Sequence, residues 1–343
     1  MSQEIVLVTG ACGEIGQALV RALGEQGKYR ILTLDLAPLP AELTPFVEEH
    51  IQGDLLLRVK QLYERTFDSI FHLAAFLSSK AERMPEEAHR INVDGTFELL
   101  LLAARKSEQR GRAIRFFFPS SIAVYGLPDR RTKEQAGAVR EEEWTTPHTL
   151  YGCHKLSGEQ LGHYFSHYYG QKHLDPQPPA MVDFRALRFP GLISAFTVPS
   201  GGTSDYGPEM LHAAAQGKPY ACFVDAETRL PFMAMPDAVR AICQLMEAPA
   251  ERLSRRSYNV GSFSLSAQDF HDWAGRAFPG ASITYARNPY RQGIVDSWPA
   301  AVDDSAARRD WGWEPVYDVE RFFEEYLLPN LRERYGLSSV AQV

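Results

Sequence analysis

The sequence predicts an α/β fold in which a doubly wound parallel sheet is followed by a smaller C-terminal lobe. Three observations favour this class. Short β-branched runs alternate with helical patterns, and a glycine-rich turn joins the first run to the first helix. From Pro190 onward the sequence becomes rich in Pro, Gly and Ser. Strands that alternate with helices form parallel βαβ units, whose crossovers are almost always right-handed.

The first predicted unit is a strand, a glycine turn and a helix. Ile5–Thr9 is a short β-branched run, and Glu14–Gly27 carries apolar residues at helical spacing. Arg30–Asp35 supplies the second strand. This order is typical of Rossmann-type sheets.

Further strands and helices follow in alternation. The expected strands are 69–75, 114–118 and 184–189, and the expected helices are 88–106 and 151–169. We therefore predict a first domain at residues 1–187, to which the chain returns at about 232–262, and a smaller lobe at 188–231 and 263–335. Asp129–Glu143 is charge-dense and Lys172–Ala180 is rich in proline, so both are predicted to be solvated surface loops.

Charge and composition exclude several classes of protein. The 343 residues carry 36 Lys and Arg against 43 Asp and Glu, and the net charge of −7 disfavours a nucleic-acid-binding protein. No apolar run approaches the ~18 residues of a membrane span, and the first residues lack the features of a signal peptide. A cytoplasmic protein without membrane contact is predicted. The four cysteines are scattered and the ten histidines show no ligand spacing, so no metal site is predicted.

The glycine turn has the features of a dinucleotide site. Thr9–Gly16 reads T-G-x-x-G-x-x-G between a predicted strand and a predicted helix, the context that makes this pattern specific. Gly10 allows the tight turn, Gly13 lets the backbone approach a pyrophosphate, and Gly16 permits close packing of helix on strand. The first domain is therefore predicted to bind a dinucleotide.

Asp35 predicts which dinucleotide is bound. It closes the second strand, where a carboxylate accepts hydrogen bonds from the adenosine ribose hydroxyls and would repel a 2′-phosphate. Leu36 follows it rather than a basic residue, so NAD is predicted rather than NADP. Asp54 follows the expected third strand, where it either meets the adenine amino group or belongs to a plain turn.

A Tyr and a Lys at helical spacing are candidates for proton transfer. Tyr151 and Lys155 are four residues apart in a predicted helix, which places a phenol beside an ammonium group. A free Tyr titrates near ~10, and an adjacent positive charge favours its phenolate, which could then act as a base. Ser120 and Ser121 follow the Phe-rich strand, at the sheet edge where α/β folds bind ligands.

Together these motifs resemble the extended short-chain dehydrogenases/reductases. The resemblance is carried by Thr9–Gly16, His72–Ala75, Asn92–Thr96, Ser120–Ser121 and Tyr151–Lys155. Further segments resemble, within that group, the short-chain-type L-threonine 3-dehydrogenases: Leu187–Ser194, Gly201–Tyr206, Thr228–Pro231, Met246–Leu253, Ser297–Pro299 and Asp303–Ser305. That family oxidises the threonine β-hydroxyl with NAD+ to 2-amino-3-oxobutyrate.

The resemblance implies roles for individual residues. Ser121 would hydrogen-bond the reacting hydroxyl, Tyr151 would be the base, and Lys155 would bind the nicotinamide ribose and lower the pKa of Tyr151. Substrate contacts are implied at Ser78, Thr203, Arg188 and Trp298, although a structural role fits the last two equally well. Further cofactor contacts are implied at Cys12, Glu14, Ile15, Leu55, Leu73, Ala74, Ala75, Asn92 and Leu192. The implied substrate is L-threonine and the implied assembly a homodimer.

Two other classes of protein share part of the pattern. Nucleotide-sugar epimerases and dehydratases use the same fold, glycine motif and Tyr/Lys pair, but the matches at 201–206 and 297–299 argue against them. A non-catalytic NAD-sensing protein is the second alternative. Such proteins commonly lose the Tyr/Lys pair, which this sequence retains.

Overall fold

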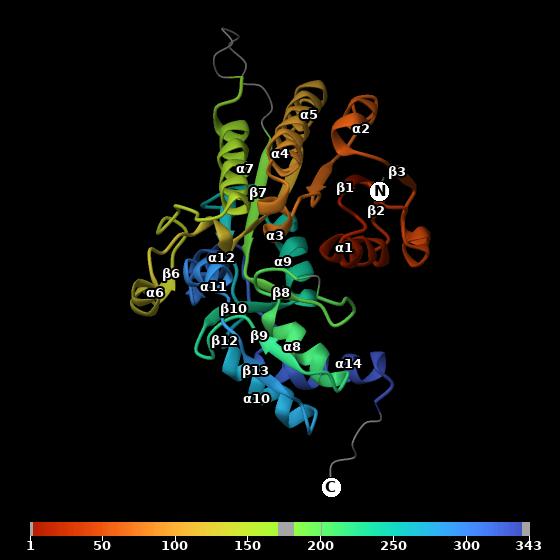
Figure 1. Cartoon of the computed structure of the whole chain (residues 1–343). Coiled ribbons are helices and arrows are strands. Elements are labelled where there is room, and N and C mark those ends of the chain that lie inside the picture. Colours follow the sequence, from red (N-terminus) through yellow and green to blue (C-terminus); the bar gives the residue numbers. More distant parts are fainter. Residues whose placement is uncertain (1–2, 171–181, 200, 338–343) are drawn as a thin grey trace.

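A seven-stranded parallel sheet forms the centre of the molecule. The computed structural model describes residues 3–170, 182–199 and 201–337. The strand order in the large sheet is β11-β7-β5-β4-β1-β2-β3, and all neighbouring pairs are parallel (Figure 1). The strands are β1 (Glu4–Thr9), β2 (Tyr29–Asp35), β3 (Glu49–Gln52), β4 (Ser69–His72), β5 (Arg115–Ser121), β7 (Asp183–Phe189) and β11 (Ser257–Asn259). The predicted doubly wound α/β fold is confirmed.

Helices cover both faces of this sheet because successive side chains of each strand point to opposite sides. Val6 and Val8 of β1 pack in one core with α1 (Glu14–Glu25) and α9 (Met235–Glu247). Leu7 between them belongs to a second core, which includes α2 (Leu55–Leu62), α5 (Gly95–Arg110) and part of α7 (Leu150–His167). Helices α5 and α7 lie side by side (Figure 1).

The strand order places a switch point beside β1. The chain passes from β1 to β2 on one side, and β4 then pairs with the other side of β1. In open α/β sheets ligands bind at such a point, outside the carboxyl ends of the strands. The ends of β1 and β4 are therefore where a cofactor site is expected.

Smaller sheets and helices form the second half of the molecule. Strand β10 (Arg229–Ala234) pairs with β8 (Gly191–Ile193) and β12 (Phe263–Ser266), and β9 (Tyr220–Cys222) pairs with β13 (Ile283–Tyr285). Their core contains fully buried aromatic rings of Tyr206, Phe232, Phe270 and Phe322. Helices α8 (Tyr206–Ala215), α10 (Ala267–Ala277), α11 (Pro289–Asp296) and α14 (Leu328–Arg334) surround this core. The domain boundaries given above stay a prediction.

The segment 129–143 is largely exposed, as expected, but it is not the expected loop. It contains α6 (Arg130–Ala136) and β6 (Ala138–Val139), and β6 pairs with β14 (Ala301–Val302). Val139 is fully buried, and the buried Nζ of Lys133 donates to the Val295 carbonyl at 2.8 Å. Val295 and β14 lie far away in the sequence, so the charge density of the segment does not predict these contacts. The predicted loop Lys172–Ala180 lies outside the described residues.

The remaining elements are short. They are α3 (Ser78–Arg83), α4 (Pro85–His89), α12 (Ser305–Trp311), α13 (Val319–Arg321) and the helical turns η1 (Ala41–Phe46), η2 (Arg90–Asp94), η3 (Ile122–Val124), η4 (Ala250–Arg252) and η5 (Phe322–Leu327). Within the described ranges, no helix combines the length and apolar character that crossing a membrane requires.

Candidate active site

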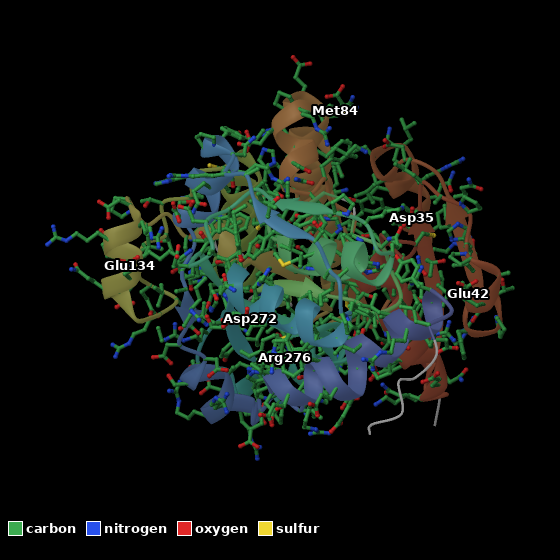
Figure 2. All side chains as sticks on the ribbon, turned by 60° about the horizontal axis from the view of Figure 1, so that its bottom comes forward. Asp35, Glu42, Met84, Glu134, Asp272 and Arg276 are labelled. Atoms are coloured by element: carbon green, nitrogen blue, oxygen red, sulfur yellow. The ribbon has the colours of Figure 1, made fainter. Side chains whose placement is uncertain are left out.

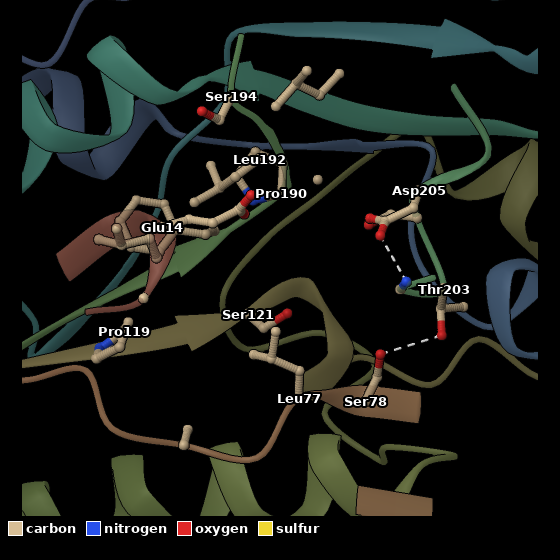
Figure 3. Close-up of a pocket in the computed structure, with 18 of the residues that line it drawn as sticks. Glu14, Leu77, Ser78, Pro119, Ser121, Pro190, Leu192, Ser194, Thr203 and Asp205 are labelled. Carbon is tan, nitrogen blue, oxygen red and sulfur yellow. Dashed lines mark hydrogen bonds between the residues drawn. The ribbon is translucent and has the colours of Figure 1, made fainter. Parts of the chain in front are cut away.

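A cavity of about 310 Å³ lies at the switch point of the large sheet. Its walls come from the glycine turn after β1, the segments that follow β4, β5 and β7, and one face of α7. Figure 3 shows Ser78, Ser121 and Pro190 from the segments around the ends of β4, β5 and β7. Fourteen predicted site residues line it: Gly10, Gly13, Glu14, Ile15, Gly16, Leu73, Ala75, Ser78, Ser121, Tyr151, Lys155, Leu192, Thr203 and Trp298. Seven do not: Cys12, Asp35, Asp54, Leu55, Ala74, Asn92 and Arg188.

The glycine turn is shaped to receive a pyrophosphate. Gly10 has φ +70°, and a Cβ there would lie 2.5 Å from the backbone nitrogen of Ala74. A Cβ at Gly16 would lie 2.2 Å from the Gly10 carbonyl oxygen, so neither position accepts a side chain without movement. No side chain caps the N-terminus of α1 at Gly13. The uncapped N–H groups and the helix dipole fit a dinucleotide phosphate.

Asp35 is held against the glycine turn at the end of β2. Its carboxylate accepts hydrogen bonds from the backbone nitrogens of Cys12 and Ala37, each at 2.9 Å. This fixes a negative charge where the adenosine ribose of a dinucleotide lies in Rossmann-type folds. The next residue, Leu36, is 64% exposed and apolar. This position therefore offers no positive charge to a 2′-phosphate.

Three of the residues outside the cavity have structural contacts that explain their places. The Asp54 carboxylate caps α2 by accepting from the backbone nitrogens of Leu56 and Leu57. The side chain of Leu55 is buried in the core below it. Asn92 hydrogen-bonds both backbone groups of Phe76 and so fixes the segment after β4. Cofactor contacts by these residues stay a prediction.

Helix α7 carries Tyr151 and Lys155 into the cavity. Thr149 caps the helix by accepting from the Gly152 nitrogen at 3.0 Å, and Glu82 accepts from the Leu150 nitrogen at 2.8 Å. Gly152 lets the first turn lie against the chain after β5, because a Cβ there would be 2.0 Å from the Ala123 carbonyl oxygen.

Within the cavity, Ser121 and Lys155 flank the Tyr151 ring. The Lys155 Nζ is 5.5 Å from the centroid of the Tyr151 ring. The Ser121 hydroxyl lines the same cavity beside the Tyr151 side chain. The structure therefore brings together the three residues for which catalytic roles were expected.

Burial controls the protonation of this group. It raises the pKa of Tyr151 above the ordinary range of a phenol, and the nearby Ser121 hydroxyl offsets this only in part. The lowering of the Tyr151 pKa expected from Lys155 and the nicotinamide charge therefore stays a prediction for the complex with NAD. Burial also lowers the pKa of Lys155 to about 7, although the carboxylate of Glu159 opposes this.

The opposite wall of the cavity carries small polar groups. The hydroxyls of Ser78 and Thr203 lie 3.3 Å apart, and Asp205 accepts from the Gly202 nitrogen at 2.6 Å (Figure 3). Trp298 is 5% exposed, and its Nε1–H has no hydrogen-bond partner in the described part of the chain. Glu14 accepts a hydrogen bond from Thr197, a contact between α1 and this wall that the glycine motif does not predict.

Arg188 does not reach the cavity, so the expected substrate contact is corrected. Its guanidinium is buried and binds the carboxylate of Glu159, with Nη2 2.6 Å from Oε2. The Glu141 carbonyl and the Tyr125 hydroxyl accept from its Nη1. Sequence reasoning also missed Glu159, although its place one helical turn after Lys155 could have indicated it.

Fold and site define an NAD-dependent enzyme. The sequence profile of the NAD dependent epimerase/dehydratase family matches residues 6–261, and this chain belongs to that family. Its cofactor is NAD. No group of His, Cys, Asp or Glu within the described ranges could hold a metal ion.

Several threonine dehydrogenases are similar to the chain along most of its length. The mitochondrial L-threonine 3-dehydrogenase of Bos taurus is 34% identical over 92% of this chain and 80% of its own. The L-threonine 3-dehydrogenase of Trypanosoma brucei has a TM-score of 0.82 at 33% identity, covering 98% of this chain and 99% of its own. A holo GalE-like L-threonine dehydrogenase from Cupriavidus necator has a TM-score of 0.80 at 34% identity, covering 95% and 99%. The resemblance seen in the sequence is confirmed.

Proposed function

We propose that this protein oxidises the β-hydroxyl of L-threonine with NAD+ to give L-2-amino-3-oxobutyrate and NADH. The observation that carries the proposal is the composition of one cavity. The Ser121, Tyr151 and Lys155 side chains and the dinucleotide turn line the same space as Ser78, Thr203 and Trp298. The similar threonine dehydrogenases support the choice of substrate.

The polar groups of the cavity also favour a small substrate. The remaining hydroxyls and the indole N–H suit a compact zwitterion, which needs a few polar contacts at fixed positions.

Each residue of the group has a distinct task in the proposed reaction. When bound, NAD+ supplies a hydride acceptor at nicotinamide C4 and a positive charge beside the phenol. Tyr151 in its phenolate form accepts the proton of the threonine hydroxyl, and Ser121 holds the same oxygen. Lys155 as an ammonium ion contacts the nicotinamide ribose and favours the phenolate. The polar groups of the cavity hold C3 of the substrate in a reactive orientation.

A substrate panel tests the proposal. Purified protein is incubated with NAD+ and L-threonine, L-allo-threonine, L-serine or nucleotide sugars while NADH absorbance is followed. We expect net NADH formation with L-threonine at the highest kcat/KM of the panel. An epimerase would recycle the cofactor and form no net NADH. Cofactor reduction by another substrate but not by L-threonine would contradict the proposal. A cytoplasmic homodimer stays a prediction from the sequence.

A further inference from the structure

A buried ion pair lies directly behind the catalytic group. Glu159 on α7 and Arg188 at the end of β7 form two parallel contacts, Nε to Oε1 at 2.9 Å and Nη2 to Oε2 at 2.6 Å. Both side chains are at most 6% exposed. Ser120 at the end of β5 donates its hydroxyl hydrogen to the same carboxylate. Glu159 follows Lys155 by one helical turn, so the two side chains lie on one face of α7.

The pair is fully connected to the surrounding structure. Beyond Glu159, the Arg188 Nη1 donates to the Tyr125 hydroxyl at 3.0 Å and to the Glu141 carbonyl at 2.6 Å. The Tyr125 hydroxyl in turn donates a hydrogen bond to Asn259 Oδ1 at 2.7 Å. A buried ion pair contributes little net stability compared with an apolar contact of the same volume. The position of the Glu159–Arg188 pair beside the Tyr151/Lys155 group therefore indicates a role other than stability.

The charges around Lys155 indicate that role. Tyr151 and Glu159 lie one helical turn before and after it on α7, and the Phe118 ring of β5 lies 4.7 Å from its Nζ. His154 on α7 and His72 on β4 are near enough to interact with its charge; burial lowers the pKa of His72 to about 3 and also lowers the pKa of His154. Among these groups, only Glu159 carries a negative charge that attracts the ammonium.

We propose that Glu159, held in place by Arg188 and Ser120, is a positioning residue that keeps Lys155 protonated while the cofactor is bound. This rests on the proposed role of Lys155 at the nicotinamide ribose. Because burial brings the pKa of Lys155 to about 7, its charge changes near neutral pH. Loss of the Glu159 charge lowers that pKa further, and loss of the Arg188 charge raises it because the carboxylate is then less neutralised.

The pH dependence of NADH binding tests this inference without any substrate. The dissociation constant of NADH is measured by fluorescence from pH 5.5 to 9.5 for the wild type, Glu159→Gln and Arg188→Gln. Lys155 is charged below its pKa, so the wild type should bind more weakly as pH rises, with a midpoint near 7. The midpoint should move down by about one unit in Glu159→Gln and move up in Arg188→Gln. A shift of opposite sign in the two variants is a result that lost packing alone cannot give.

Two further variants separate charge from structure. Asp183→Asn breaks another ion pair of β7, Asp183 with Arg185 at 2.6 Å, and should leave the midpoint unchanged. Arg188→Lys keeps the positive charge and should also leave it near the wild-type value. If Glu159→Gln fails to fold, the pH midpoints of NADH binding are compared between Arg188→Gln and Arg188→Lys. A higher midpoint in Arg188→Gln alone would support the inference.

The inference would be overturned if the wild type, Glu159→Gln and Arg188→Gln had the same midpoint. It would also be overturned if NADH binding by the wild type did not depend on pH. The proposed function can fail separately. A wild type with the expected midpoint that forms no NADH from L-threonine would reject the proposed substrate alone.

Discussion

The two halves of the molecule hold the same cavity in different ways. On one side, parallel strands that are neighbours in a single large sheet present the glycine turn and Ser121 at their carboxyl ends. On the other side, Thr203 and Trp298 stand on connections between small sheets, and their positions depend on segments far apart in the sequence. In the proposed reaction, cofactor binding and proton transfer thus rely on the edge of the large sheet, whereas substrate recognition relies on long-range pairing.

The largest expected effect concerns Tyr151, where the halves meet. Tyr151→Phe removes only the proton acceptor, so kcat should fall by about a hundredfold or more while NADH affinity stays nearly unchanged. Steady-state rates and NADH fluorescence measure the two quantities. Tyr164→Phe, at a 47% exposed position on the same helix, is the matched control. Retention of more than about a tenth of kcat in Tyr151→Phe would remove Tyr151 from its role as the base.

Glycine substitutions in the two halves should have opposite results. Gly16→Ala would place a Cβ 2.2 Å from the Gly10 carbonyl oxygen, which distorts the dinucleotide turn. We expect a loss of more than tenfold in NADH affinity. At the exposed Gly275 in α10, no atom lies within 4 Å of the added Cβ. Gly275→Ala should therefore raise the free energy of unfolding by about 0.5–1 kcal/mol. Normal NADH binding by Gly16→Ala would contradict the close approach at this turn.

The segment 129–143 offers a test of long-range pairing in the second half. Val139→Ala deletes two buried methyl groups and should lower the free energy of unfolding by about 2 kcal/mol. Val316→Ala, at a 41% exposed position, should change it by less than about 0.5 kcal/mol. Urea unfolding of both variants measures the difference. Equal free energies of unfolding in the two variants would indicate that the contacts of the segment do not stabilise the fold, as in a solvated loop.

The smallest expected effect concerns Thr203. Thr203→Ala removes one hydroxyl from the substrate wall, worth about 1 kcal/mol of binding. The KM for L-threonine should rise about fivefold while the KM for NAD+ stays the same. Initial rates at varied concentrations of each substrate separate the two values. A change confined to the KM for NAD+ would place Thr203 on the cofactor side of the cavity.

What the sequence could predict follows the same division. The glycine turn, the Asp35 position and the Tyr151/Lys155 pair depend on short spacings, and the structure places them as expected. Strands β1, β4 and β5 could be predicted because each contains a short continuous apolar run. Helix α6 was missed because its contacts come from partners more than a hundred residues away. Figure 2 shows Glu134 of α6 at the opposite edge of the molecule from Asp35.

The contact between Arg188 and Glu159 could not be predicted for a related reason. In the sheet register, Ser120 lies opposite Arg188, and Glu159 of α7 binds both side chains. This three-way contact joins two strands and a helix. Neither helical periodicity nor a motif predicts it.

Transfer of the hydrogen on C3 of the substrate tests the central claim most directly. The wild type is mixed with NAD+ and L-threonine that carries deuterium at C3, and the reduced cofactor is analysed by mass spectrometry. The proposed reaction predicts one deuterium in each reduced cofactor molecule and a slower pre-steady-state hydride transfer than with unlabelled threonine. Reduced cofactor without deuterium, or no reduction of NAD+ by L-threonine at all, would contradict the proposed function.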